Sequence, residues 1–294
     1  MIGEQKRSGK MLKKIDRGAL FLAKQQELFR CPKCHREMIQ REKSLICGEG
    51  HRFDLSKKGT VYFLDHQIKT DYDNEMFAPR GRMIGSGMYQ PVIEKIAELM
   101  QTGNLLDVGC GEGSFLQQIT QRKENPVSIG FDIAKEGIYL ASNQPMEAFW
   151  CVADLTNLPF ADNSFDTILN IFSPSHYREF KRVMKSDGCV VKIVPQADYL
   201  KELREVYHPD GETYSNEAVI QRFTEELSIA HRERVTYEFD IPEENRLDLL
   251  EMSPLEWKVS PAVKAKLAAN PLKKITVDIE ILKGYESNRF HSNS

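Results

Sequence analysis

The sequence predicts an α/β protein in which a doubly wound sheet is preceded by a small metal-binding module. From residue 105 onward, short apolar runs alternate with stretches of helical spacing, the pattern of βαβ units. The first apolar run enters a glycine-rich turn, and Cys and His residues with metal-ligand spacing lie near the N-terminus. A chain of 294 residues, 41% of them hydrophobic, can bury one such domain and a smaller module.

Basic residues are concentrated at the start of the chain. Residues 1–66 contain 15 Lys and Arg against 8 Asp and Glu, whereas residues 67–294 contain 25 against 35, so the net charges are +7 and −10. A basic arm on an acidic body is typical of a protein that binds a polyanion. Residues 1–30, which have helical character at Arg17–Lys24, are equally consistent with a solvated charged tail.

Hydropathy gives no sign of a membrane protein. No run of eighteen apolar residues occurs, and Met1–Arg7 contains no apolar signal core. We therefore expect neither a membrane span nor secretion, and a cytoplasmic protein.

Two cysteine turns follow, at Cys31-Pro32-Lys33-Cys34 and Cys47-Gly48-Glu49-Gly50-His51. Their spacing, C-x2-C-x12-C-x3-H, brings three thiolates and one imidazole to a tetrahedral ion, which predicts a closed structural Zn2+ site. Free thiols are the alternative, because a cytoplasmic protein does not rely on disulfides. His35 competes with His51 for the fourth position, although directly after Cys34 it is cramped for binding the same ion.

The rest of the N-terminal module is expected to be small. Arg52–Leu55 and Gly59–Leu64 are predicted to continue it as strand and turn. Such a module has too little apolar area to hold itself together, so the metal should supply much of its folding free energy. A polar link then leads to an amphipathic helix from about Pro91 to Met100.

The apolar run Leu105–Val108 enters a turn with glycines at positions 109, 111 and 113, and helical spacing begins at Ser114. Glycines leave the backbone open to a nucleotide-like ligand, and the following helix offers unpaired N–H groups. The pattern G-x-G-x-G after Asp107 differs from the G-x-G-x-x-G of dinucleotide-binding turns. It resembles the S-adenosylmethionine motif of class I methyltransferases, with an ordinary glycine-rich turn as the alternative.

The later strands are predicted to complete the pocket that the glycine turn begins. Val127–Asp132 ends in an acid suited to the two ribose hydroxyls, and Phe149–Asp154 ends in one suited to the exocyclic amine of adenine. Thr167–Pro174 is strand four with its exit loop, so Asn170 to Pro174 should face the reacting methyl group. The remaining elements are a helix to Lys185, a turn at Asp187-Gly188, a strand at Val190–Val194, and a final antiparallel pair at Arg234–Phe239 and Ile275–Leu282.

From Cys31 to about Leu282 the chain resembles the RlmA-type 23S rRNA (guanine-N1-)-methyltransferases. The motifs that carry this resemblance are the cysteine turns with Arg52-Phe53-Asp54 behind them, Gly87-Met88-Tyr89-Gln90-Pro91, the glycine turn with Asp107, Ile171-Phe172-Ser173-Pro174 and Leu249-Leu250-Glu251-Met252-Ser253-Pro254. The resemblance implies a class I Rossmann-like S-adenosylmethionine-dependent methyltransferase domain preceded by a small zinc-binding module. We accordingly divide the chain into a basic N-terminal segment (1–30), a zinc-binding RNA-recognition module (31–66), a linker and cofactor-flanking segment (67–90) and a methyltransferase domain (91–294).

The resemblance also implies the reaction and its partners: transfer of a methyl group from S-adenosyl-L-methionine to N1 of a guanine in a hairpin loop of 23S rRNA, by an enzyme that the family suggests is a homodimer. By the resemblance, zinc binds Cys31, Cys34, Cys47 and His51. The cofactor-binding residues that we expect are Tyr89, Asp107, Gly109, Gly111, Glu112, Gly113, Asp132, Asp154 and Tyr199. Tyr199 departs from the histidine of some relatives, but a phenol can also donate a hydrogen bond. For RNA binding we expect Arg52, Lys57, Lys58, Arg80 and Arg82, and for positioning the acceptor base Asn170, Phe172 and Ser173.

Two alternatives stay open. One is a methyltransferase for a small metabolite, with zinc serving stability alone, and the other is a zinc-dependent RNA-binding protein without turnover. The charge asymmetry favours rRNA over a metabolite, and the acids at Asp107, Asp132 and Asp154 argue against an inactive protein. Guanine N1 must lose a proton, but no histidine falls at a strand end within the pocket motifs, so no general base is predicted.

Overall fold

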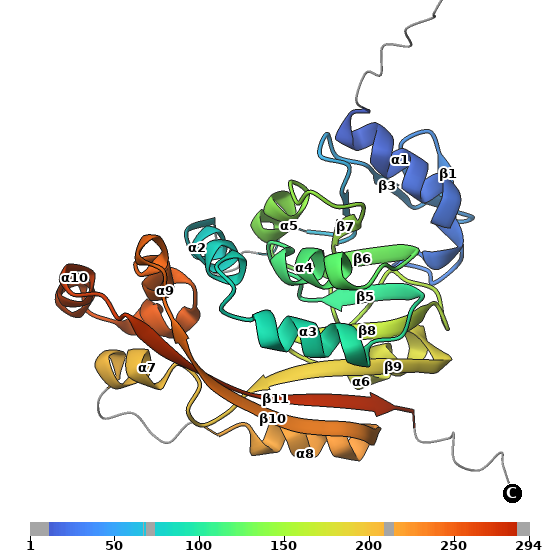
Figure 1. Cartoon of the computed structure of the whole chain (residues 1–294). Coiled ribbons are helices and arrows are strands. Elements are labelled where there is room, and N and C mark those ends of the chain that lie inside the picture. Colours follow the sequence, from blue (N-terminus) through green and yellow to red (C-terminus); the bar gives the residue numbers. More distant parts are fainter. Residues whose placement is uncertain (1–11, 67, 69–73, 209–214, 287–294) are drawn as a thin grey trace, which may run out of the picture.

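The computed structural model describes residues 12–66, 68, 74–208 and 215–286, and its main feature is a mixed sheet with helices on both faces (Figure 1). In spatial order the strands of this sheet are β10 (Ser228–Asp240), β11 (Lys274–Tyr285), β9 (Met184–Pro195), β8 (Phe165–Ile171), β5 (Asn104–Val108), β6 (Val127–Asp132), β7 (Phe149–Val152) and β4 (Val61–Tyr62). The strands from β9 to β4 are parallel, and β11 pairs antiparallel with both β9 and β10. The predicted α/β class and the final antiparallel pair are confirmed.

The chain order creates a switch point beside β5. After β5 the chain continues to β6 and β7 on one side, and then returns to β8 and β9 on the other. In open α/β sheets ligands bind beyond the carboxyl ends of the strands at such a point. The glycine turn leaves β5 at this end of the sheet, as the sequence predicted.

The helices are α1 (Lys14–Gln25), α2 (Asn74–Gly85), α3 (Gln90–Leu99), α4 (Ser114–Arg122), α5 (Lys135–Ala141), α6 (Tyr177–Val183), α7 (Lys201–Tyr207), α8 (Glu217–Glu226), α9 (Asp248–Glu251) and α10 (Pro261–Ala269), with 3-10 turns η1 (Gln26–Leu28), η2 (Glu243–Asn245) and η3 (Pro254–Lys258). Apolar residues of α3 and α4 pack in one core, whereas α6 and α8 contribute to a second core that also includes α1. In the described part of the chain, no helix has the length and apolar character needed to cross a membrane.

The N-terminal module is joined to the main sheet. Its own antiparallel sheet contains β1 (Met38–Arg41), β2 (Ser44–Cys47) and β3 (Arg52–Asp54). The segment that we expected to continue this module instead forms β4, which pairs in parallel with β7 through Val61 and Cys151. Phe29 lies 5.4 Å from Phe149 and 6.1 Å from Phe63, ring centre to ring centre, so aromatic packing links module and sheet. Apolar contacts with the main domain therefore stabilise the module in addition to any metal.

Helix α1 is part of the fold from Lys14 onward. Leu22 is fully buried, and the ring of Phe21 stacks on Phe149 at 4.9 Å. A side chain at Gly18 would approach the carbonyl oxygen of Gly59 to 2.7 Å, so a glycine allows the helix to lie against the β3–β4 loop. The tail alternative is thus excluded for this helix, while residues 1–11 lie outside the described part.

Two element boundaries differ from the prediction. The helix expected to reach Lys185 ends at Val183, and β9 already begins at Met184. Asp187 and Gly188 lie within β9, where the pairing with β8 shifts. A side chain at position 188 would meet the carbonyl of Phe165 at 2.7 Å, so this position requires glycine. Helix α2 was not predicted, and Pro79 lies inside it.

Candidate active site and metal centre

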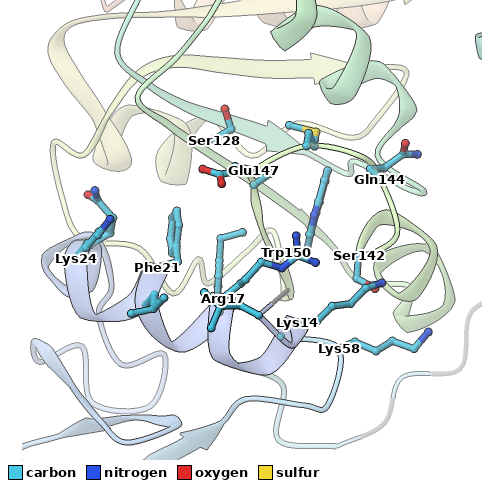
Figure 2. A pocket seen from close by; sticks show the side chains of 18 of the residues that line it. Lys14, Arg17, Phe21, Lys24, Lys58, Ser128, Ser142, Gln144, Glu147 and Trp150 are labelled. Atoms are coloured by element: carbon cyan, nitrogen blue, oxygen red, sulfur yellow. The ribbon is translucent and has the colours of Figure 1, made fainter. Parts of the chain in front are cut away.

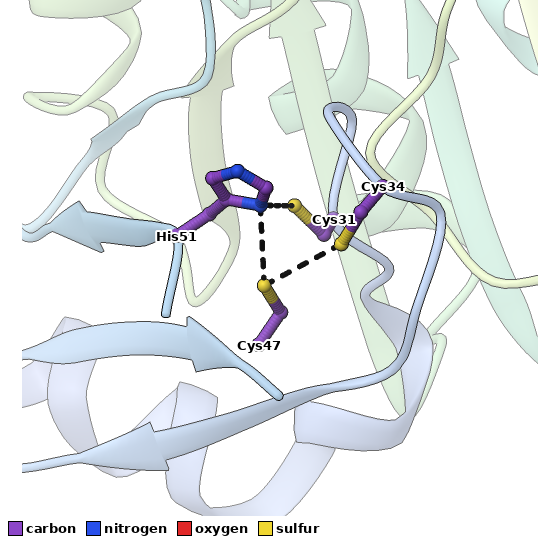
Figure 3. A group of neighbouring side chains, drawn as sticks. All are labelled: Cys31, Cys34, Cys47 and His51. Atoms are coloured by element: carbon purple, nitrogen blue, oxygen red, sulfur yellow. Dashed lines mark hydrogen bonds between the residues drawn. The ribbon is translucent and has the colours of Figure 1, made fainter. Parts of the chain in front are cut away.

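Four side chains with metal-binding atoms meet between the two cysteine turns (Figure 3). The Sγ atoms of Cys31, Cys34 and Cys47 and a ring nitrogen of His51 all lie within 4.8 Å of one another. His51 Nδ1 is 3.4 Å from Cys31 Sγ and from Cys47 Sγ. Ligands of a tetrahedral zinc ion with Zn–S bonds of about 2.3 Å lie roughly 3.5–4 Å apart, so this group fits structural zinc and leaves no position for a substrate.

Backbone hydrogen bonds shape the two turns. The amide of His35 donates to the carbonyl of Cys31 over 2.8 Å, and the amide of Gly50 donates to that of Cys47 over 2.9 Å. Gly50 has φ +82°, which a glycine adopts without strain. His35 is exposed and lies outside the four-residue group, so among the described residues His51 supplies the imidazole.

The glycine turn is built by left-handed glycines. Gly109, Gly111 and Gly113 have φ values of +67°, +54° and +80°. A side chain at Gly109 would come within 2.7 Å of Ser173 Cβ, and one at Gly113 within 2.6 Å of the Trp150 ring. The turn therefore needs glycine both for its backbone conformation and for its close contacts. Helix α4 begins directly after it.

The acids at the ends of β6 and β7 differ in their surroundings. Asp132 accepts hydrogen bonds from the amides of Gly111 (2.9 Å) and Ala134 (2.8 Å), so it also holds the glycine turn in place. Burial raises its pKa, and those two amides oppose the rise. Asp154 accepts from the amide and the hydroxyl of Thr156, both at 2.8 Å.

Three carboxylates interact electrostatically with Arg80 beside the turn: Asp107 and Glu112 are buried, and Asp132 is half-buried. Burial, with Coulombic repulsion from Asp132 and Glu112, raises the pKa of Asp107 to about 7. Arg80 Nε lies 4.0 Å from Glu112 Oε2. Within the described residues, neither Asp107 Oδ2 nor Glu112 Oε2 accepts a hydrogen bond, although both atoms are buried. Two orphaned carboxylate oxygens suit a ligand that carries positive charge, such as the sulfonium and ammonium groups of S-adenosylmethionine.

A cavity of about 270 Å³, here called the glycine-turn cavity, opens beside these residues. Its lining residues are Phe77, Arg80, Val108, Gly109, Gly111, Phe131, Asp132, Ile133, Ala153, Asp154, Leu155, Phe172, Ser173 and Pro174. The cavity is therefore lined by Asp132 and Asp154, which were predicted to bind the ribose and the adenine, by two glycines of the turn and by the loop after β8. Asp107 and Glu112 do not line it but lie behind the turn.

A second cavity of about 460 Å³, here called the aromatic cavity, shares Arg80 and Phe172 with the first. Its lining residues are Arg80, Tyr89, Phe172, Pro195, Tyr199, Leu200, Arg204, His208, Met252, Ser253, Pro254, Leu255 and Trp257. The hydroxyls of Tyr89 and Tyr199 hydrogen-bond at 2.5 Å, which brings together two residues 110 positions apart. The Met252–Pro254 motif therefore lies opposite the loop after β8.

A polar network holds that loop. Asn170 is fully buried; its Nδ2 donates to Ser173 Oγ and to the Pro174 carbonyl, at 2.6 and 2.9 Å. Its Oδ1 accepts from Ser175 Oγ and from Lys192 Nζ, at 2.7 and 2.5 Å. Ser173 Oγ donates to the Val108 carbonyl over 2.6 Å, which fastens the loop to the end of β5.

Phe172, at the tip of this loop, has φ +53°, an unusual conformation for a bulky residue. The network therefore supports a strained residue between the two cavities. Because both the oxygen and the nitrogen of the Asn170 amide already form hydrogen bonds within the protein, this side chain fixes the conformation of the loop.

The basic residues expected to bind RNA are scattered. Arg52 pairs with Asp54 at 2.7 Å, and Arg82 pairs with Asp248 at 2.6 Å. Arg80 points into the junction of the two cavities, with 23% of its side chain exposed. Lys57 and Lys58 are exposed on the loop before β4.

Sequence reasoning missed two residues of this region. Lys192 is 2% exposed in the middle of β9, and burial lowers its pKa to about 8. A lysine inside the apolar run Val190–Val194 was the available signal, since such a residue needs buried acceptors. His208, at the end of α7, lines the aromatic cavity, but no pattern in the sequence distinguishes it from other surface histidines.

Comparisons with known proteins agree with this architecture. A family model described as "RlmA, N-terminal" matches residues 29–71, and one described as "Methyltransferase domain" matches residues 106–214. A Bacillus subtilis (strain 168) protein named "Putative 23S rRNA (guanine-N(1)-)-methyltransferase YxjB" is 40% identical over 272 residues, covering 87% of this chain and 96% of that protein. A Streptomyces fradiae protein named "23S rRNA (guanine(748)-N(1))-methyltransferase" is 29% identical over 183 residues, covering 59% and 65%. A Micromonospora griseorubida protein named "Putative 23S rRNA (guanine-N(1)-)-methyltransferase" is 26% identical over 271 residues, covering 82% and 90%.

Proposed function

The chain belongs to the RlmA-type family of 23S rRNA (guanine-N1-)-methyltransferases, and from this premise we propose that it transfers a methyl group from S-adenosylmethionine to N1 of a guanine in 23S rRNA. The observation that carries the proposal is the meeting of the two cavities at Arg80 and Phe172. One cavity suits a nucleoside-bearing donor, and the other has the aromatic walls that an unstacked base requires.

On the donor side, S-adenosylmethionine supplies a methyl group on a positively charged sulfur. Asp132 is positioned to accept the ribose hydroxyls and Asp154 to accept the adenine amine, since both line the glycine-turn cavity. Asp107 and Glu112 contribute negative potential behind the turn, which favours a cationic ligand. Tyr89 and Tyr199, expected from sequence to bind the cofactor, line the aromatic cavity beside Arg80 and are joined by a hydrogen bond.

On the acceptor side, guanine N1 lies on the pairing edge, so the base must be unpaired or flipped before it can react. Trp257, which is 44% exposed, lines the aromatic cavity beside Phe172 and Tyr199 and offers a ring surface on which the base can stack. The loop after β8 carries the Ser173 hydroxyl and the carbonyls of Ser173 and Pro174, and Asn170 sets its conformation by hydrogen-bonding to all three. Asn170 is therefore a positioning residue in this proposal, and Phe172 and Ser173 are the residues that touch the ligands.

The division of labour expected from sequence forms part of the proposal: the zinc-binding module (31–66) and its basic neighbours position RNA, and the methyltransferase domain (91–294) carries out methyl transfer. Deletion of residues 1–66 is a poor test of it, because the deletion would uncover the edge of β7 and the apolar side chains under α1. Point substitutions on the surface keep the fold intact. The homodimer and the cytoplasmic location stay predictions, and sedimentation velocity on the purified protein tests the first.

Primer extension on 23S rRNA tests the reaction, because an N1-methyl group blocks the pairing edge and halts the polymerase. A strain without the gene should lose one stop, and the wild-type gene should restore it. The Trp257→Ala variant should restore it poorly, whereas Leu247→Ala, a change to an exposed residue outside both cavities, should restore it fully. The scan covers the whole rRNA, with guanine 748 checked first because the Streptomyces fradiae relative is named for it. An unchanged pattern of polymerase stops in the deletion strain would contradict the proposal and favour a methyltransferase for a small metabolite instead.

A further inference from the structure

A groove of about 330 Å³, lined in part by Trp150, lies between α1 and the segment that connects α5 to β7 (Figure 2). One wall is a stripe of α1 with Lys14, Arg17, Phe21 and Lys24, which are spaced to lie on one helix face. The other wall runs from Ser142 to Trp150, and Lys58 from the loop before β4 closes one end.

The charges around this groove are unbalanced. Four cations line it, Lys14, Arg17, Lys24 and Lys58, against one acidic residue, Glu147. In the described ranges no carboxylate forms an ion pair with any of these four cations. Burial lowers the pKa of Lys14, and repulsion from Lys58 and Arg17 lowers it further, so the cations interact with one another.

The cations continue toward the active site. Lys58 and Lys135 both place their Nζ atoms over the ring of Tyr139, at 5.1 and 5.2 Å from its centre. Lys135 is the first residue of α5 and follows Asp132 and Ile133, which line the glycine-turn cavity. Lys24, Arg17, Lys14, Lys58 and Lys135 thus form a continuous series, here called the basic row, from α1 to the edge of that cavity.

The aromatic residues in the groove are not available for stacking on a base. Phe21 already stacks on Phe149, and Trp150 is 5% exposed with its ring against Gly113. A mononucleotide pocket would need a free ring or amides for the base, whereas a row of cations alone suits a chain of phosphates.

We infer that the basic row binds the phosphate backbone of the RNA substrate and guides it from α1 to the active site. The inference rests on the proposed function for the identity of the polyanion. The basic row is one continuous surface, unlike the scattered residues that the sequence analysis expected to bind RNA. Of those residues, only Lys58 belongs to the row. Helix α1 precedes residues 29–71, so the zinc-ribbon family model does not include most of this surface.

The salt dependence of RNA binding tests the row. Protein-free 23S rRNA from a strain lacking the gene is the probe, and filter binding gives the affinity between 50 and 200 mM salt. Each lost phosphate contact should reduce the log–log salt slope by about 0.7 to 0.9, so Arg17→Gln/Lys58→Gln should reduce it by about 1.4 to 1.8. Both side chains are exposed, so the double variant should fold normally.

The matched control is Arg222→Gln/Lys283→Gln, which removes two positive charges from α8 and β11, far from α1 (Figure 1). This control should keep the wild-type slope, and both double variants should keep the wild-type affinity for S-adenosylmethionine. A row variant with the wild-type slope, or a control with an equal loss, would overturn the inference. Formation of N1-methylguanosine by the wild-type enzyme on the same RNA tests the proposed function separately. That measurement compares no variants of the basic row, so failure of one proposal can be told from failure of the other.

Discussion

Lys192 Nζ lies 2.5 Å from Asn170 Oδ1, and both side chains are buried beside the loop that carries Phe172. The same ammonium donates to Ser175 Oγ at 2.9 Å and to the Ser173 carbonyl at 3.3 Å. The described residues place no carboxylate within ion-pair distance of it. A buried charge held by neutral oxygens is costly, so its value lies in the conformation that it imposes on the loop.

Replacement of this ammonium should impair the site more than the fold. In Lys192→Met the loss of three hydrogen bonds is offset by removal of an uncompensated buried charge, so Tm should change little. Affinity for S-adenosylmethionine and kcat should each fall about tenfold, or about 1.4 kcal/mol, because Ser173 and Pro174 lose their fixed positions. Lys185→Met, on the same strand but paired with Asp166, is the control and should leave cofactor affinity unchanged. A low Tm combined with normal cofactor affinity would show that Lys192 serves stability alone.

Removal of one metal ligand should release the zinc. Cys47→Ala leaves three of the four ligands, so zinc measured by mass spectrometry should fall from one ion per chain to a small fraction. Hydrogen exchange should increase first in β1 to β3, because these strands form a sheet of their own, whereas β4 pairs with β7 and Phe21 of α1 stacks on Phe149. Cofactor affinity should change little. Cys151→Ala, a buried cysteine of β7 outside the group, is the control, and full zinc occupancy in Cys47→Ala would contradict the ligand assignment.

Loss of the charge on Asp132 should weaken cofactor binding. Asp132→Ala would release the amides of both Gly111 and Ala134, whereas Asp132→Asn keeps one acceptor oxygen and releases only one of them, so Asp132→Asn is the milder change. A charge-assisted hydrogen bond contributes about 1.5–3 kcal/mol, so calorimetry should show an affinity loss of roughly 10- to 100-fold. Asp162→Asn, at an exposed acid paired with Arg182, should have no effect. Equal affinities for Asp132→Asn and wild type would mean that the ribose lies elsewhere.

The strongly periodic parts of the chain were predictable, and the parts set by tertiary contacts were not. β5 and β6 appear where apolar runs end in a glycine turn and an acid, because those patterns are local. The sequence of Val61–Tyr62 is compatible with pairing either within the N-terminal module or with β7. The available edge of β7 and the aromatic contacts determine that it pairs with β7, and neither can be read from the sequence. Helix α2 was missed because a polar link was expected in this part of the chain, whereas burial of Met76, Phe77 and Met83 stabilises a helix even with Pro79 inside it.

In the candidate site, the types of the functional residues were easier to predict than the contacts that each residue makes. Cys31, Cys34, Cys47 and His51 were predictable because zinc demands both ligand type and spacing. Asn170 was expected to meet the acceptor base, but whether a side chain at a strand end points to the ligand or into the protein depends on partners such as Lys192, 22 residues away.

Binding of S-adenosylmethionine should release protons near neutral pH. Burial, with repulsion from Asp132 and Glu112, raises the pKa of Asp107 to about 7, so this group is substantially protonated in the free protein at pH 6.5. A cationic ligand favours the carboxylate form and lowers that pKa, which expels the proton. The affinity should therefore rise as pH increases through 7 and level off above about pH 8, where Asp107 is already ionised. Calorimetry at pH 6.5 in phosphate and in Tris, whose ionisation enthalpies differ, measures the proton released, and Asp107→Asn should abolish the difference between buffers. Identical heats in both buffers for the wild-type protein would show that the three carboxylates do not sense the charge of the cofactor.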